Sequence, residues 1–154
     1  RHRSGSITHW SYAFPMLRQL FGFKSPRLTI DVDEERIVDQ RRGWVVVANS
    51  SAYAKGLNPA RHASVTDELL DVVFLPVKKR SDIIWWMGKL LRGTHLDYSG
   101  VISRRGAEIV ITSDDPAVWQ LDGDPSPDVD GTKRLDVRVD PASLPIITTT
   151  CHCQ

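Results

Sequence analysis

The sequence predicts a mainly β protein, a two-layer antiparallel β-sandwich with one or two short helices. Apolar segments of strand length recur along the chain, and turn-forming pairs such as Asp-Gly and Asp-Pro separate them. Only one segment has a clear helical period. The 154 residues are 41% hydrophobic and 25% charged, which is typical of globular proteins and excludes wholesale disorder.

Seven segments have the character of strands. Residues 28–32 and 133–139 alternate apolar with polar side chains, as half-buried strands do. The continuous apolar runs 43–49 and 70–75 are expected to be buried on both faces. The other strands are expected over residues 98–104, 107–112 and 117–121, with turns at 105–106, 114–116 and 122–123.

A helix is predicted over residues 81–92. Ser81 can cap its start, Asp82 suits the positive end of the helix dipole, and Gly93 can end it. The side chains expected to face the core are Ile83, Ile84, Met87, Leu90 and Leu91.

Trp85 falls on nearly the opposite face of this helix, with Lys and Arg residues nearby, and two interpretations stay open. Indole rings favour the headgroup level of a bilayer and cations favour anionic lipid, so Trp85 could mark peripheral contact with an anionic membrane. Alternatively, Trp85 packs on another domain or under a loop.

Residues 1–27 are expected to be a linker or an N-terminal helical segment, because Trp10, Phe14 and Phe21 have helical spacing that Pro15 interrupts. Residues 28–147 are expected to form the sandwich, and 148–154 a tail. Since the chain starts at Arg1 without an initiator Met, we expect a piece of a longer protein.

Several classes of site have no signal in this sequence. A net charge of +1 gives no basis for a nucleic-acid partner, and we expect none. There is no Gly-rich phosphate loop, and the tail residues Cys151-His152-Cys153 cannot close a tetrahedral metal site alone. With both cysteines in the last four residues, no disulfide framework exists, and we predict a cytoplasmic protein.

Two acidic clusters, residues 66–71 and 120–124, remain as candidates for chemistry. Each flanks a predicted strand, so their carboxylates are either ordinary turn residues or parts of a site.

Taken in order, these segments resemble the C-terminal β-rich domain of the diacylglycerol kinase and sphingosine kinase superfamily, over residues 28–147. The resemblance is carried by a strand that ends in Asn49, a loop with Gly56, and Asp67-Glu68-Leu69-Leu70-Asp71 before a strand. The helix at 81–92 and the late Asp122-Gly123-Asp124 complete the order. The order and spacing of these motifs carry the match.

The resemblance implies the lipid-side domain of an ATP-dependent kinase that phosphorylates a lipid hydroxyl. ATP and Mg²⁺ would be held with a separate N-terminal domain, whose Gly-rich signature this chain lacks. The isolated chain is therefore expected to be inactive and to bind no cofactor. Asp124 would be the general base, and Asp67 would hold Mg²⁺ or a basic group of the partner domain near the cleft. The expected partners are that domain and the lipid substrate.

Three positions depart from the family pattern. The glycine triplet of the family reads Ala54-Lys55-Gly56, the glycine after Asp67 is Glu68, and the general-base Glu is Asp124. Asp is shorter than Glu by one carbon–carbon bond, roughly 1.5 Å of reach. These departures favour an alternative, a non-catalytic β-sandwich derived from such a kinase that binds lipid or a partner protein. A generic interaction module is a third possibility.

Overall fold

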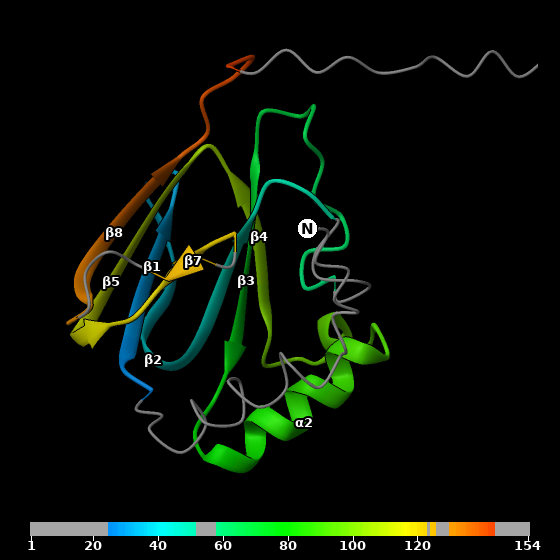
Figure 1. The fold of residues 1–154 in the computed structure, drawn as a ribbon, viewed down its shortest axis with the longest axis vertical. Coiled ribbons are helices and arrows are strands. Elements are labelled where there is room, and N and C mark those ends of the chain that lie inside the picture. Colours follow the sequence, from blue (N-terminus) through cyan, green and yellow to red (C-terminus); the bar gives the residue numbers. More distant parts are fainter. Residues whose placement is uncertain (1–24, 52–57, 123, 126–129, 144–154) are drawn as a thin grey trace, which may run out of the picture.

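The computed structural model describes residues 25–51, 58–122, 124–125 and 130–143. In these residues it contains a six-stranded antiparallel sheet, a small hairpin, one α-helix and a 3-10 turn (Figure 1). The predicted mainly β fold is confirmed, whereas the predicted helix near Trp10 lies outside the described residues. The elements are β1 (Arg27–Val32), β2 (Glu35–Ala48), β3 (Leu70–Pro76), α2 (Arg80–Leu91), η2 (His95–Asp97), β4 (Ile102–Gly106), β5 (Glu108–Ala117), β6 (Gln120–Leu121), β7 (Asp124–Pro125) and β8 (Thr132–Arg138).

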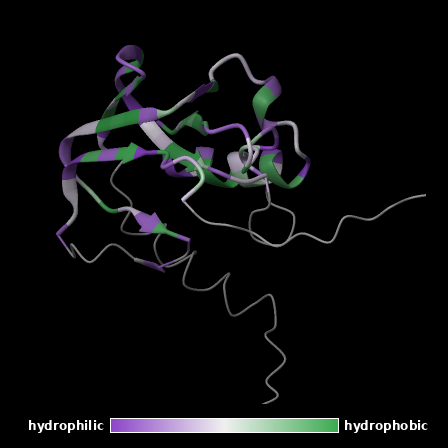
Figure 2. Ribbon diagram, turned by 90° about the horizontal axis from the view of Figure 1, so that it is seen from above, coloured by the Kyte–Doolittle hydropathy of each residue, from purple (hydrophilic) through white to green (hydrophobic). Residues whose placement is uncertain are grey.

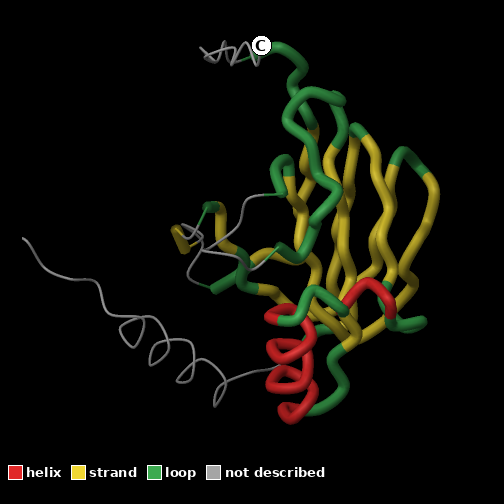
Figure 3. The backbone as a smooth tube through the Cα atoms, turned by 90° about the vertical axis from the view of Figure 1, so that its right-hand side faces the viewer, coloured by secondary structure: helices red, strands yellow, loops and turns green. Residues whose placement is uncertain are grey.

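Strand β2 joins two layers of the large sheet, whose strand order is β4-β3-β2-β1-β5-β8. Its first half pairs with β1, and its second half, from Gly43 onward, pairs with β3. The sheet therefore turns along β2, and the β1-β5-β8 layer faces the β3-β4 layer across a shared core (Figure 3).

Strand β3 is buried on both faces, as its continuous apolar sequence predicted. Leu70, Val72 and Phe74 contribute to the core between the layers, together with side chains of β1, β2 and β5. Val73 and Leu75 point to the other side, where α2 and the residues around Ala60 cover them. Both layers and the helix thus meet on one strand.

Gly43 sits where β2 passes from one layer to the other. A Cβ atom on this residue would lie 2.5 Å from the Leu75 carbonyl oxygen and 2.5 Å from ring atoms of Phe74. Only glycine fits this approach, because real Cβ contacts do not come so close.

Helix α2 ends as predicted but begins differently. Gly93 has φ +65 and donates its N–H to the Leu90 carbonyl, which is the usual C-terminal glycine motif. At the start, the residue preceding the helix is Lys79, not Ser81. The Asp82 carboxylate accepts the backbone N–H groups of Lys78 and Lys79 at 2.8 and 3.0 Å. These two hydrogen bonds lower the pKa of Asp82, and the bond from Lys78 has the larger effect.

The buried face of α2 differs from the predicted stripe. Ile83 and Trp86 are buried, and the Trp86 indole N–H donates to the Pro76 carbonyl at 2.6 Å. Ile84 and Leu91, which were expected in the core, are 71% and 68% exposed. The bond from Trp86 to the end of β3 rotates the helix so that these two side chains face outward.

Three strand predictions were wrong in detail. The strand predicted from Gly43 begins at Glu35, and its residues 44–48 are only partly buried. Residues 98–101 precede β4 rather than belong to it, and the predicted turn at 105–106 is instead the end of β4. The predicted turn at 114–116 lies inside β5, where pairing with β8 shifts between Thr112 and Ala117, and the predicted strand 117–121 reduces to the two residues of β6. The charged residues in the first half of β2 concealed its strand character, and the irregular pairing of β5 with β8 lets β5 continue through the predicted turn.

Replacing Gly43 by Ala should lower the free energy of unfolding by about 2 kcal/mol or more, because the backbone must move to admit the methyl group. Gly88→Ala is the matched control. Its Cβ would meet only the flexible Arg92 side chain, at 3.2 Å, so helix propensity should stabilise α2 by up to about 1 kcal/mol. Urea unfolding midpoints measure both variants, and equal losses would contradict the proposed close approach.

Asp82→Ala should cost about 1 kcal/mol of stability at neutral pH, because two N–H groups lose their acceptor. The folded-state pKa of Asp82 lies below its unfolded value, so the stabilisation is complete above the unfolded pKa and is lost as pH falls through the folded one. The difference between wild type and variant should therefore shrink below about pH 4. A difference that stays constant down to pH 2 would refute this role.

Candidate functional site

Residues 58–69 form a loop that leads into β3 and carries Asp67 and Glu68 of the first acidic cluster, whereas Asp71 lies in β3 itself. His95 of η2 holds the start of this loop through a hydrogen bond. It is fully buried, and its Nε2 lies 2.7 Å from the Pro59 carbonyl oxygen. Because a carbonyl only accepts, Nε2 carries the proton of this bond. His95 therefore ties the loop to the segment that follows α2.

Arg105, near the end of β4, binds two of the three acids of the first cluster, Asp67 and Asp71. Its Nη2 lies 2.7 Å from Oδ2 of Asp67, and its Nε lies 3.4 Å from Oδ2 of Asp71. Nη2 also donates to the His62 carbonyl at 3.2 Å. Asp71 is 3% exposed, and its partner Arg105 faces it directly across the β3–β4 pair. A buried carboxylate requires such a partner.

Asp67 itself has both carboxylate oxygens in use. Oδ1 accepts the backbone N–H of Leu69 at 3.2 Å, while Oδ2 accepts from Arg105. The next residue, Glu68, has φ +58, a left-handed conformation in which a side chain is strained. The backbone here thus has the shape that suits the glycine of the family pattern.

The contacts of Asp67 bear on the predicted magnesium. Magnesium prefers oxygen ligands in octahedral geometry, and an ion at Asp67 would compete with Arg105 for the same oxygen. In the described part of the chain, no group of three or more His, Cys, Asp or Glu side chains is placed to hold a metal. The assignment of Mg²⁺ to Asp67 stays a prediction, and the cation that Asp67 contacts is a guanidinium.

Asp124 lies apart from this cluster, on the β6–β7 hairpin, where it pairs with Leu121. It is exposed, and Asp122 in the turn before it has φ +51. The hairpin stands off the face of the large sheet (Figures 1 and 3). Among the interactions of the described residues, none joins Asp124 to Asp67. The two predicted site residues therefore lie on different elements, Asp67 on the loop before β3 and Asp124 on the β6–β7 hairpin. Their catalytic roles stay predictions.

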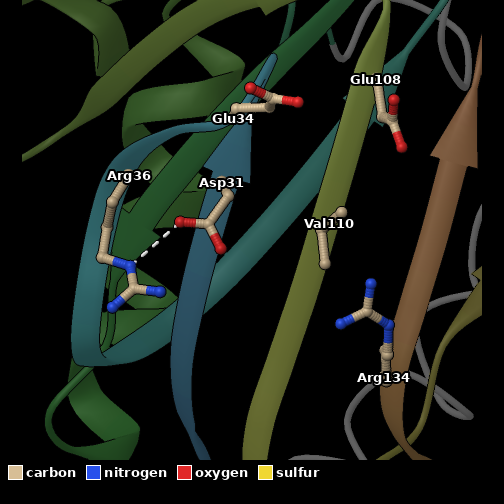
Figure 4. Close-up of a pocket in the computed structure, with 6 residues that line it drawn as sticks. All are labelled: Asp31, Glu34, Arg36, Glu108, Val110 and Arg134. Atoms are coloured by element: carbon tan, nitrogen blue, oxygen red, sulfur yellow. Dashed lines mark hydrogen bonds and ion pairs between the residues drawn. The ribbon is translucent and has the colours of Figure 1, made fainter.

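A shallow hollow of about 520 Å³ lies on the outer face of β1, β5 and β8 (Figure 4). Its charges are largely matched: Asp31 bonds to Arg36 at 3.0 Å, and Glu108 is 2.7 Å from Arg138. None of the predicted site residues lines it. The residues that do are Asp31, Glu34, Arg36, Glu108, Val110 and Arg134.

Sequence reasoning missed Arg105, which it assigned to a turn. The signal was Asp71, an acid within an apolar run that was expected to be buried on both faces. Such an acid requires a cation, but only the strand register identifies Arg105 as the residue opposite.

Comparison with solved structures finds the same fold. A candidate diacylglycerol kinase from Bacillus anthracis str. Sterne matches with a TM-score of 0.59 and 15% identity, over 81% of this chain and 41% of that one. A second structure, described as a diacylglycerol kinase from the same strain, matches with a TM-score of 0.52 and 16% identity, over 77% of this chain and 40% of that one. This chain therefore spans about two fifths of the length of these proteins.

No curated protein matches the chain. The family model for the YegS C-terminal NAD kinase beta sandwich-like domain matches residues 3–148. That match covers nearly the whole sequence and agrees with the two-layer sheet and with the likeness to diacylglycerol kinases. The chain belongs to the family of YegS C-terminal NAD kinase beta sandwich-like domains.

Proposed function

We propose that this chain is the lipid-side domain of an ATP-dependent kinase that phosphorylates a lipid hydroxyl. The observation that carries the proposal is the family match together with coverage of only about two fifths of structures described as diacylglycerol kinases. The remaining part of such a protein would supply the nucleotide-binding domain, and the substrate would lie between the two.

In the proposed reaction, the lipid hydroxyl oxygen attacks the γ-phosphorus of ATP. The bond from that phosphorus to the bridging oxygen breaks, ADP leaves, and Asp124 accepts the hydroxyl proton. Phosphoryl transfer depends mainly on positioning and charge stabilisation. Mg²⁺ bound with the nucleotide would supply charge neutralisation. The exposed carboxylate of Asp124, on a hairpin that stands off the sheet, supports the assignment because a substrate can approach it.

Asp67 and Arg105 have a positioning role in this proposal. Their ion pair holds the loop at residues 58–69 against the end of β4, next to the first residues of β3. A second candidate function is a non-catalytic sandwich that binds lipid or a partner protein, and three features favour it. Arg105 already neutralises the charge of Asp67, Glu68 places a side chain at a left-handed backbone position, and Asp124 is one carbon–carbon bond shorter than the Glu of the family pattern.

Asp124→Asn should lower kcat by about 10²–10⁴-fold in the full-length protein, with little change in KM for ATP, because the amide keeps the size of the side chain but cannot accept a proton. Phosphoryl transfer from labelled ATP to diacylglycerol, sphingosine and ceramide is the assay. Asp124→Glu restores the family residue and should keep or raise activity.

Asp122→Asn is the matched control, since it makes the same change two residues earlier, at a left-handed position that Asn tolerates. If the Asp124 and Asp122 variants retain equal turnover, Asp124 is not the base. If the full-length wild type phosphorylates none of the three lipids, the non-catalytic alternative is favoured.

Arg105→Ala should destabilise the chain by about 1–3 kcal/mol, because Asp71 stays buried without its cation; the half-exposed guanidinium keeps the loss below that of a fully buried pair. Arg104→Ala removes the neighbouring exposed arginine and should change stability by less than about 0.5 kcal/mol. Thermal unfolding with and without magnesium chloride tests both variants. Strong stabilisation of the wild-type chain by magnesium would instead favour a metal at Asp67.

A further inference from the structure

We propose that the outer face of α2 docks on the surface of an anionic lipid bilayer. We define this outer face by four exposed side chains, Ile84 at 71%, Trp85 at 43%, Leu91 at 68% and Tyr98 at 46%. Ile84 and Leu91 are two helical turns apart and so share one side of α2. Tyr98 lies just after η2 and joins this face through the contact of its ring with Trp85. Large apolar side chains gathered on one exposed surface indicate an interaction site.

The aromatic residues of the outer face are held in place before any contact is made. Trp85 packs edge to face against the buried Trp86, with ring centroids 4.6 Å apart, and against Tyr98 at 5.1 Å. Trp86 is fixed in turn by its bond to the Pro76 carbonyl. Tryptophan and tyrosine are the residues that favour the headgroup level of a bilayer, because they combine an apolar ring with a polar group.

Cations surround the outer face. The Lys89 ammonium lies 5.4 Å from the centroid of the Trp85 ring, and the one acid of the helix, Asp82, is bound to backbone N–H groups at the helix start. An exposed apolar face bordered by Lys and Arg is typical of helices that lie in the plane of an anionic membrane surface. The exposed or half-exposed cations on α2 and next to its ends are Lys78, Lys79, Arg80, Lys89 and Arg92.

The positive charge around the outer face of α2 favours a negatively charged surface as its partner. A second copy of α2 would bring a like-charged surface against this one, and residues 1–24 of the chain carry Arg and Lys but no acid. Repulsion between positive charges therefore disfavours both a second copy of α2 and residues 1–24 as the occupant of this face. The negatively charged phosphate groups of anionic lipid are complementary to it. No helix of the described residues is long and apolar enough to cross a membrane. In the proposed contact, α2 lies on the bilayer surface with its exposed apolar side chains toward the lipid.

This inference goes beyond the proposed kinase activity and does not require it, since binding is measured on the 154-residue chain without nucleotide. The probe is a set of sucrose-loaded vesicles of phosphatidylcholine with 30–40% phosphatidylglycerol, roughly matching an anionic membrane surface. Sedimentation should carry the chain down with these vesicles, and much less with vesicles of pure phosphatidylcholine or in high salt.

The double variant Ile84→Ser/Leu91→Ser should bind these vesicles about tenfold more weakly or worse, because it removes apolar area that the bilayer would cover. Its melting temperature should stay close to that of the wild type, since both side chains are exposed. Val118→Ser/Leu121→Ser is the matched control. It makes the same type of change at side chains that are 77% and 66% exposed elsewhere, and it should bind like wild type.

Lys79→Gln/Lys89→Gln tests the charges and should also weaken binding about tenfold, while Arg104→Gln/Lys133→Gln, on strands away from α2, should not. Wild-type chain that stays in the supernatant with anionic vesicles would overturn the proposal. Equal binding of the Ile84/Leu91 variant and the Val118/Leu121 control would also overturn it. So would a dimer in analytical ultracentrifugation that needs Ile84 and Leu91 and forms without vesicles.

Discussion

Strand β3 is packed from both sides, and that packing positions both the loop that carries Asp67 and the helix α2. Phe74 and its neighbours at alternate positions fill the space between the layers, while Val73 and Leu75 pack with Ile83 and Trp86 of α2. Figure 2 shows hydrophobic stretches, in green, along the strands and in the helix. The start of β3 carries Asp71 and the loop with Asp67, and its end accepts the indole of Trp86 through the Pro76 carbonyl. A shift of this strand along its axis would disturb the acidic cluster and the helix together.

The sequence was informative wherever one local pattern determined the outcome. The buried apolar run of β3, the alternation in β8 and Gly93 at the end of α2 form as their residue types predict. β1 is a strand as predicted, but Thr29 is buried together with its apolar neighbours. These features depend on period, propensity or a single backbone conformation, each of which is legible in a short window.

The remaining features depend on contacts between distant segments. The rotation of α2 follows from the bond between Trp86 and Pro76, and the burial of Asp71 is tolerable only because β4 places Arg105 opposite. The first half of β2 reads as a charged, polar segment, yet it pairs with β1 because the Asp33–Glu34 turn reverses the chain with two positive φ angles. Neither a strand register nor a helix rotation is encoded in a short sequence window.

The order of strands also bears on how this chain reaches its native state. β1 to β4 follow one another as neighbours, but β5 returns to pair with β1, so Leu28 meets Ser113 from the far part of the chain. A contact of such long sequence separation requires a large loop to close before any pairing energy is gained. The layer formed by β1, β5 and β8 is therefore the slower part to assemble, and until it docks, the inner face of β3 is open to water and to other unfolded chains.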